Sequence, residues 1–171
     1  GNAIHLYNNS TLDVRGSVGT VTQIANGTIN SGGAAITHSG AGNLYLGTED
    51  GAMTTSAQGA NTGALNTGGH LIILEGVKLL GSKGNAVKNT GNSNIYFQGT
   101  PTLRSGGGAD IDLGRGIIGL RKALTNARIP YTVYLPDYNA SVDPPRRVTD
   151  VWSSKMGSAD PKDYFTISVP N

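Results

Sequence analysis

Several features are missing from this sequence, and each absence narrows the class of protein. The 171 residues include no cysteine, which excludes a disulfide scaffold and a cysteine-based metal site. Charged residues amount to 14% and the formal net charge is +2, which is too weak a charge to indicate a nucleic-acid partner. No stretch approaches the roughly 20 consecutive apolar residues of a membrane span, so membrane insertion is not expected.

Motifs of metal and cofactor chemistry are also absent from the sequence. The three histidines have no ligand spacing, and no phosphate loop, zinc pattern, nucleophile elbow or dinucleotide fingerprint occurs. The sequence therefore predicts neither a bound metal nor a cofactor. It opens at Gly1 inside a repeated phrase, without an initiator methionine or a signal peptide, so we expect it to be a piece of a longer protein.

The sequence does contain a phrase that occurs three times. Each copy has two short runs in which apolar residues alternate with others, as in half-buried strands, and the runs are separated by turn residues. Repeats spaced 20–50 residues apart indicate stacked units that cannot bury their apolar faces alone. We therefore predict an all-β fold, a right-handed parallel β-helix. The copies read GNAIHLYNNSTLDVRG from Gly1, GAAITHSGAGNLYLGT from Gly33 and GNAVKNTGNSNIYFQG from Gly84.

The step from the second copy to the third is longer than the step from the first to the second. A solenoid accommodates such an insert as a loop on one face. The segment 48–69 has few charges and few large apolar side chains, so it is predicted to be a long surface loop that is suited to binding.

The composition changes near residue 100, since all seven prolines and the single tryptophan lie after it. We place Gly-rich β-helix coils in residues 1–103 and a capping or distal domain in residues 104–171. Ile117, Leu120, Leu124 and Ala127 recur at roughly helical spacing, which predicts a short amphipathic helix at about 115–127 that caps the open end of the solenoid.

Residues 71–80 form a run that is apolar on both faces. One face belongs to the solenoid interior, so the other needs a cover from outside its own coil. The two alternatives are the predicted cap helix and a second subunit, and we expect a homotrimer that buries part of the run.

Three acidic residues are the candidates for catalysis. Asp110 and Asp112 would point to one side of an extended segment, where paired carboxylates could cleave a glycosidic bond or bind a cation. They could equally be solvated or cap the predicted helix. Glu75 lies within the apolar run, where a raised pKa is conceivable, although pairing with Lys78 or exposure beside Gly76 also accounts for it.

Tyrosine and tryptophan side chains are the candidates for glycan binding, because they combine a flat apolar face with a polar group. If the leucines and isoleucines of the second run point inward, its tyrosines point outward on one face of successive coils. They could instead form a subunit interface or a side-chain ladder. The candidates are Tyr45 and Tyr96 in the coils, and Tyr131, Tyr134, Tyr138 and Trp152 in the distal part.

The Gly- and Asn-rich coils such as 33–48, followed by a charged, Tyr-rich part that ends in FTISVPN, resemble the distal part of a bacteriophage tailspike or tail fibre. This resemblance implies a pectin-lyase-like β-helix, a homotrimer and binding of a bacterial surface polysaccharide by an extracellular virion protein. The first coils also look like passenger segments of bacterial autotransporter adhesins. The expected function is glycan receptor binding; the alternatives are a polysaccharide depolymerase, hydrolase or lyase, that uses Asp110 and Asp112 or Glu75, and a surface adhesin.

Overall fold

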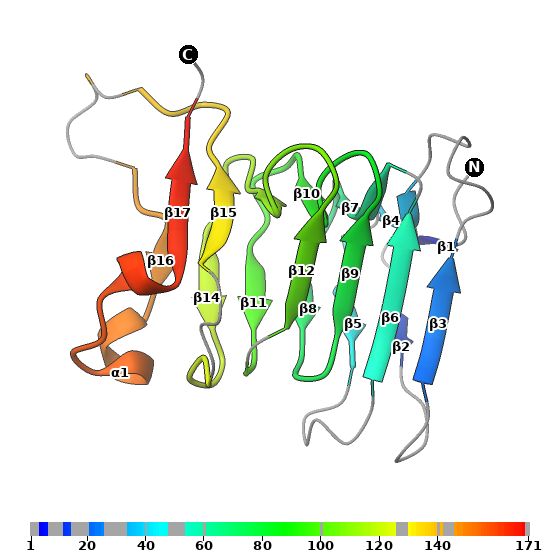
Figure 1. Cartoon of the computed structure of the whole chain (residues 1–171), viewed down its shortest axis with the longest axis horizontal. Coiled ribbons are helices and arrows are strands. Elements are labelled where there is room, and N and C mark those ends of the chain that lie inside the picture. The colour runs from blue at the N-terminus through cyan, green and yellow to red at the C-terminus, as the bar shows by residue number, and fades with distance from the viewer. Residues whose placement is uncertain are drawn as a thin grey trace.

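All strands of the computed structural model are parallel, and they form a β-solenoid of about four turns (Figure 1). From β1 to β12, successive strands of the chain pass through three sheets, here called A, B and C, before the chain returns to sheet A one level further along the axis; from β13 on, they alternate between sheets A and B. The predicted all-β solenoid is therefore confirmed. The structure describes residues 4–6, 12–14, 21–25, 34–39, 41–47, 54–59, 61–99, 101–125, 130–139, 141 and 146–169.

The three sheets differ in their numbers of strands. Sheet A has seven: β1 (Ile4–Leu6), β4 (Ala34–His38), β7 (Thr62–Asn66), β10 (Val87–Asn89), β13 (Ile111–Asp112), β15 (Tyr131–Tyr134) and β17 (Phe165–Ser168). Sheet B has six: β2 (Leu12–Val14), β5 (Leu44–Leu46), β8 (Leu71–Ile73), β11 (Ile95–Phe97), β14 (Ile118–Leu120) and β16 (Thr149–Asp150). Sheet C has four: β3 (Val21–Ala25), β6 (Thr54–Gly59), β9 (Lys78–Gly81) and β12 (Thr102–Ser105).

The solenoid interior is filled by rows of apolar side chains that run from coil to coil along each sheet. Because side chains alternate along a strand, the residues that pair in register share a face. Large side chains of sheet B form two such rows, and Leu79 and Leu103 continue the core under sheet C. The predicted core positions of sheet B are thus confirmed for Leu44, Leu46, Ile95 and Phe97; the side chains of Leu12 and Val14 lie outside the described part.

The segment 48–69, predicted to be a surface loop, contains a coil of the solenoid. Residues 54–59 are β6 and residues 62–66 are β7, and β7 pairs with β4 on one side and β10 on the other. Ala64 lies in register between Ile36 and Val87, so the third repeated phrase is two coils away from the second. The prediction was wrong because small side chains fill this level, which left the apolar alternation too weak to see.

The helix predicted at about 115–127 is also wrong, since Ile118–Leu120 is strand β14 and the described residues 115–125 contain no helix. The spacing of Ile118 and Leu120 fits the alternation of a strand as well as one face of a helix. Gly114, Gly116 and Gly119 disfavour a helix. Ile118 and Leu120 pair in register with Ile95 and Phe97 of β11, and this pairing favours the strand. Residues 126–127 lie outside the described part.

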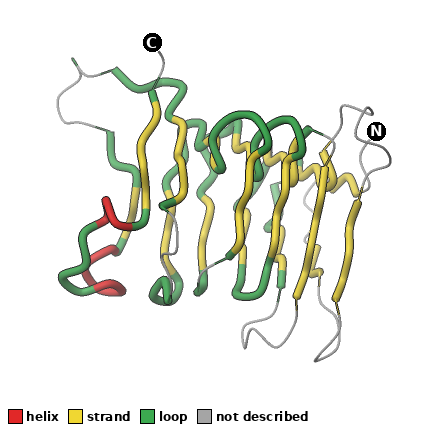
Figure 2. The backbone as a smooth tube through the Cα atoms, in the orientation of Figure 1, coloured by secondary structure: helices red, strands yellow, loops and turns green. Residues whose placement is uncertain are grey.

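Helical structure occurs instead near the C-terminus, in α1 (Trp152–Met156) and the 3-10 helix η1 (Pro161–Asp163) (Figure 2). Trp152 and Met156 pack against the core, together with Tyr164. Sheets A and B continue across the boundary predicted between residues 103 and 104, whereas sheet C ends at Ser105. That boundary stays a prediction. No helix in the described part is long and apolar enough to span a membrane.

Most of the apolar run 71–80 is covered by neighbouring coils of the same chain; its outward Leu80, on sheet C, is partly exposed. Its outward residue Ile72 is only 4% exposed and lies in register between Tyr45 and Tyr96 on the outer face of sheet B. Leu74 and Val77, in the turn toward sheet C, are buried as well. The run therefore gives no argument for an outside cover, and the homotrimer stays a prediction.

Candidate functional site

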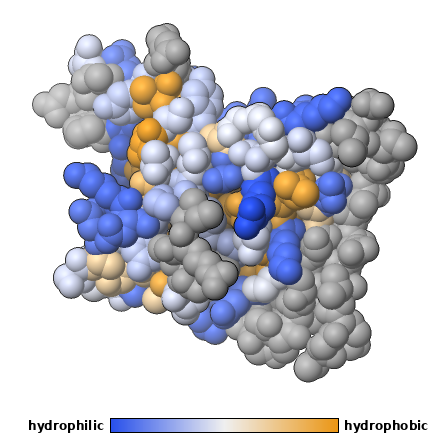
Figure 3. Space-filling model, viewed as in Figure 1, coloured by the Kyte–Doolittle hydropathy of each residue, from blue (hydrophilic) through white to orange (hydrophobic). Residues whose placement is uncertain are grey.

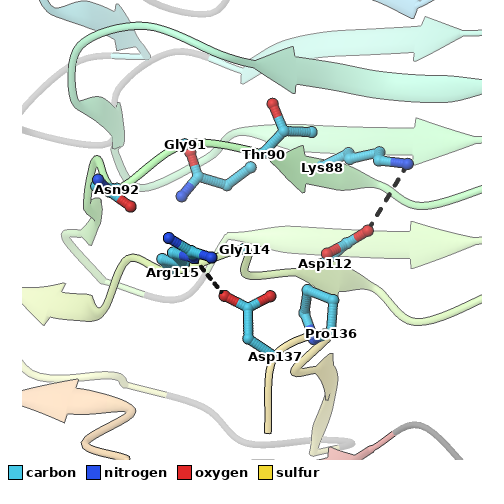
Figure 4. A pocket seen from close by; sticks show the side chains of 10 residues that line it. Lys88, Thr90, Gly91, Asn92, Asp112, Gly114, Arg115, Pro136 and Asp137 are labelled. Atoms are coloured by element: carbon cyan, nitrogen blue, oxygen red, sulfur yellow. Dashed lines mark hydrogen bonds and ion pairs between the residues drawn. The ribbon is translucent and has the colours of Figure 1, made fainter.

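A polar groove of about 560 Å³ lies on the outer side of sheet A, where β10, β13 and β15 end (Figure 4). Three consecutive levels of the solenoid contribute to it, so residues about one coil apart in sequence lie side by side. It is lined by Lys88, Asn89, Thr90, Gly91, Asn92, Asp112, Gly114, Arg115, Pro136 and Asp137.

A close approach of two backbone turns shapes the floor of this groove. Gly114 has a φ of +58°, which glycine adopts without steric cost. A Cβ at this position would lie 2.0 Å from the carbonyl oxygen of Asn89. Only glycine therefore lets the turn after β13 lie against the turn after β10.

Charges of both signs alternate across the groove. Lys88 and Asp112 are register neighbours on the outer face of sheet A, and the Lys88 Nζ lies 3.9 Å from the Asp112 Oδ2. The Arg115 Nε donates a 2.8 Å hydrogen bond to the Asp137 Oδ2. Both ion pairs are marked in Figure 4. Since two pairs share one concave surface, the groove offers donors and acceptors within a short distance of each other.

The two carboxylates of the groove differ in their surroundings. The side chain of Asp112 is only 14% exposed, whereas that of Asp137 is 39% exposed. Burial raises the pKa of Asp112 and the charge of Asp137 adds to the rise, while Lys88 and the backbone of Gly114 oppose it. Asp112 therefore holds its proton to higher pH than an ordinary aspartate does.

A further arginine, Arg146, interacts electrostatically with two residues of the groove, Asp137 and Arg115. The Arg146 Nη2 donates a hydrogen bond to the carbonyl oxygen of Gly116, and its Nη1 is buried without a hydrogen-bond partner among the described residues. Burial lowers the pKa of Arg146, while nearby Asp137 raises it and nearby Arg115 lowers it. The charges of Asp137, Arg115 and Arg146 thus act on one another.

The predicted acidic candidates do not come together in one site. Asp110 accepts hydrogen bonds from the backbone N–H groups of Ser105 and Thr132, so both of its carboxylate oxygens join neighbouring segments. Only Asp112 lines the groove. Glu75 lies in the turn between sheets B and C, where a Cβ on Gly99 would meet its Oε2 at 3.0 Å.

Two of the predicted aromatic candidates are used in packing. Tyr131 is buried and its hydroxyl donates to the carbonyl oxygen of Pro101; burial, followed by the charge of Asp110, raises its pKa. The Trp152 Nε1 donates a 2.7 Å hydrogen bond to the Ala159 carbonyl oxygen, and its ring packs edge-on against Tyr164 and Phe165.

The other aromatic candidates are at least partly exposed. Tyr134 lies in register with Asp112 on the outer face of sheet A, and Tyr138 is 37% exposed. On sheet B, Tyr45 is partly exposed and Tyr96 lies over Gly119, with its hydroxyl accepting from the Asn94 Nδ2.

Sequence reasoning missed Lys88, Arg115 and Asp137 as site residues. The signal that could have found Lys88 is the coil length, because a step of one coil places it beside Asp112. That length became measurable only when the hidden coil was recognised. The described part of the chain contains no group of three or more acidic or histidine side chains that could hold a metal ion.

Comparison with known protein families, with curated proteins and with solved structures gives no match for this chain.

Proposed function

We propose that this chain binds a bacterial cell-surface polysaccharide in the groove between Lys88 and Asp137, as a receptor-binding piece of a bacteriophage tailspike or tail fibre. The observation that carries the proposal is the mixture of lysine, arginine, aspartate and asparagine side chains in one open groove. Sugar hydroxyl groups both donate and accept hydrogen bonds, so they suit a surface that offers both kinds of partner.

The framework around the groove favours recognition of a rigid ligand. Lys88 and Asp112 project from paired strands, which hold the two side chains in register and limit the ordering needed on binding. Tyr134 continues the same outward row beside Asp112 and is partly exposed. Its ring offers an apolar face on which a sugar ring can stack. The homotrimer and the virion location belong to this proposal.

A second candidate function is hydrolysis of the bound polysaccharide. The specific observation in its favour is that two carboxyl groups line one groove: burial raises the pKa of Asp112, and Asp137 accepts a hydrogen bond from the guanidinium of Arg115. A carboxyl that keeps its proton can act as general acid, while an ionised partner acts as base or nucleophile. Asp137 replaces Asp110 in this hypothesis.

The test measures binding and cleavage together. Purified chain is titrated with capsular polysaccharide and lipopolysaccharide from a panel of bacteria, and new reducing ends or unsaturated products are assayed in the same samples. We expect Lys88→Ala to weaken binding at least tenfold. The matched control Lys78→Ala removes an exposed lysine from sheet C and should leave binding unchanged.

Each other outcome has a definite meaning. Loss of binding in Tyr45→Ala or Tyr96→Ala, with Lys88→Ala unaffected, would move the site to sheet B and overturn the groove. Products that disappear in Asp112→Asn would establish the hydrolase. A monomeric mass by light scattering would favour the adhesin alternative over the trimeric tail protein. Absence of binding to every polysaccharide tested would reject the proposal.

A further inference from the structure

A ladder of polar side chains runs through the interior of the solenoid at the end of sheet A. Asn66 of β7 and Asn89 of β10 are register partners, and both are fully buried. The Asn66 Nδ2 donates a 2.7 Å hydrogen bond to the Asn89 Oδ1. Each asparagine also donates to a carbonyl oxygen of the turn that follows it, Asn66 to Gly69 and Asn89 to Ser93. The ladder therefore joins the coils and closes the turns.

His38 occupies the same position one coil earlier. It is the register partner of Asn66 and ends β4 as Asn66 ends β7. Its side chain is 0% exposed, yet neither the Nδ1 nor the Nε2 makes a well-formed hydrogen bond in the described part of the structure, although polar groups of Asn66 and Gly42 lie near the ring. A titratable ring thus stands where the next two coils have an uncharged amide.

The described strands of sheets A and B in the coil of His38 and in the next coil contain no charge that could compensate a proton on the ring. Strands β4, β5, β7 and β8 have no Asp, Glu, Lys or Arg. On the other side, β1 places Leu6 in register with His38, and its titratable His5 is in register with Thr37. Burial lowers the pKa of His38, and the Asn66 side chain and the Gly42 backbone oppose this only in part. The neutral ring is therefore the form that the folded interior accommodates.

We propose that His38 makes the solenoid acid-sensitive, because protonation of this ring inside the asparagine ladder loosens sheet A at β4. A histidine whose folded-state pKa lies below its unfolded-state value stabilises the fold fully above the unfolded value of about 6.5. This contribution is lost as the pH falls from about 6.5 toward the folded-state pKa. In that window the unfolding equilibrium constant rises by up to about tenfold per pH unit. The device is independent of whether the groove binds a glycan.

The decisive variant is His38→Asn, which gives the second coil the ladder residue of the third and fourth coils. Urea denaturation of wild type and variant is followed between pH 7.5 and pH 5. We expect the unfolding constant of wild type to rise up to about fivefold more than that of His38→Asn between pH 6.5 and pH 5.5. The matched control is His70→Asn, because His70 lies outside the ladder beside Tyr96; it should keep the wild-type slope.

Two results would overturn the proposal: an unchanged slope in His38→Asn, or loss of the slope in His70→Asn. Should His38→Asn fail to fold, the wild-type protein alone decides. An NMR titration must then show that the folded-state pKa of His38 lies below the ordinary histidine value of about 6.5. The protection of the amides of residues 34–38 against hydrogen exchange, corrected for the pH dependence of the intrinsic exchange rate, must also fall between pH 6.5 and pH 5.5. A His38 that titrates at or above its ordinary pKa contradicts the inference.

Discussion

The two faces of sheet A are built from the same strands and differ completely in their residues. Its inward row consists of small or branched apolar side chains, nearly all fully buried: Ile36, Ala64, Val87, Ile111 and Val133. Its outward row changes character at every level: Thr37, Leu65, Lys88, Asp112 and Tyr134. Packing restricts the first row to shapes that fill a shared interior. The second row is buried at Thr37 but partly exposed from Leu65 to Tyr134, where side chains of different chemistry are tolerated.

The comparison predicts that stability depends on the inward rows and that binding depends on the outward row. Substitutions on the two faces should therefore separate these properties. The changes below run from the largest expected effect to the smallest.

Phe97→Ala should have the largest effect on stability. Phe97 is fully buried and contacts the ring of Tyr131, so its removal leaves a cavity that a solenoid built of short strands can close only in part. We expect the free energy of unfolding to fall by about 3–5 kcal/mol, measured by urea denaturation. A loss below about 1 kcal/mol would mean that the inward rows do not carry the stability.

Asn89→Ala should destabilise the ladder without creating a large cavity. It removes the acceptor of Asn66 and the donor to the carbonyl oxygens of Ser93 and Leu113. Buried groups left without a partner cost about 1–3 kcal/mol in the free energy of unfolding. The control is Asn92→Ala, an exposed residue of the same turn, for which thermal denaturation should show little change; equal losses in both variants would contradict the role of the ladder.

Asp112→Asn should leave stability at pH 7 unchanged or slightly higher. Burial opposes the ionised carboxyl more than Lys88 supports it, so the folded-state pKa is raised. An acid with a raised folded-state pKa stabilises the fold only while protonated, and this contribution is lost as the pH rises above its unfolded value of about 3.9. The free energy of unfolding of wild type, relative to that of Asp112→Asn, should therefore be higher at pH 4 than at pH 7. Denaturation of both proteins at the two pH values measures this difference. A variant that is much less stable at pH 7 would show that the Lys88 pair dominates.

Lys78→Ser should have the smallest effect of the four. Lys78 is exposed on the outer face of sheet C, the side turned toward the viewer in Figure 3, where hydrophilic residues surround small apolar areas. Exposed substitutions of this kind change the free energy of unfolding by no more than about 0.5 kcal/mol. A thermal denaturation midpoint well below that of wild type would reveal a contact made by this face.

The alternation of Leu44 and Leu46, and of Ile95 and Phe97, was sufficient to predict strands, a shared interior and stacked parallel coils. That success has a simple cause, since side chains that alternate on a strand must bury one face, and repeats that cannot do so alone must stack. The same reasoning failed for residues 54–66, where small side chains such as Ala57 and Ala64 fill the interior. It failed again at Ile118 and Leu120, whose spacing fits either a helix or a strand.

The groove could not be predicted from the alternation of residues along the sequence. Asp112 was found because it lies two residues after Asp110 in a segment expected to be extended, but its neighbours Lys88 and Asp137 lie one coil away in opposite directions along the chain. Which residues meet across coils depends on the length of every intervening turn, and the turns are set by close backbone contacts such as that of Gly114 with Asn89. Local alternation thus determines which residues face inward, whereas only the stacked coils decide which outward residues become neighbours.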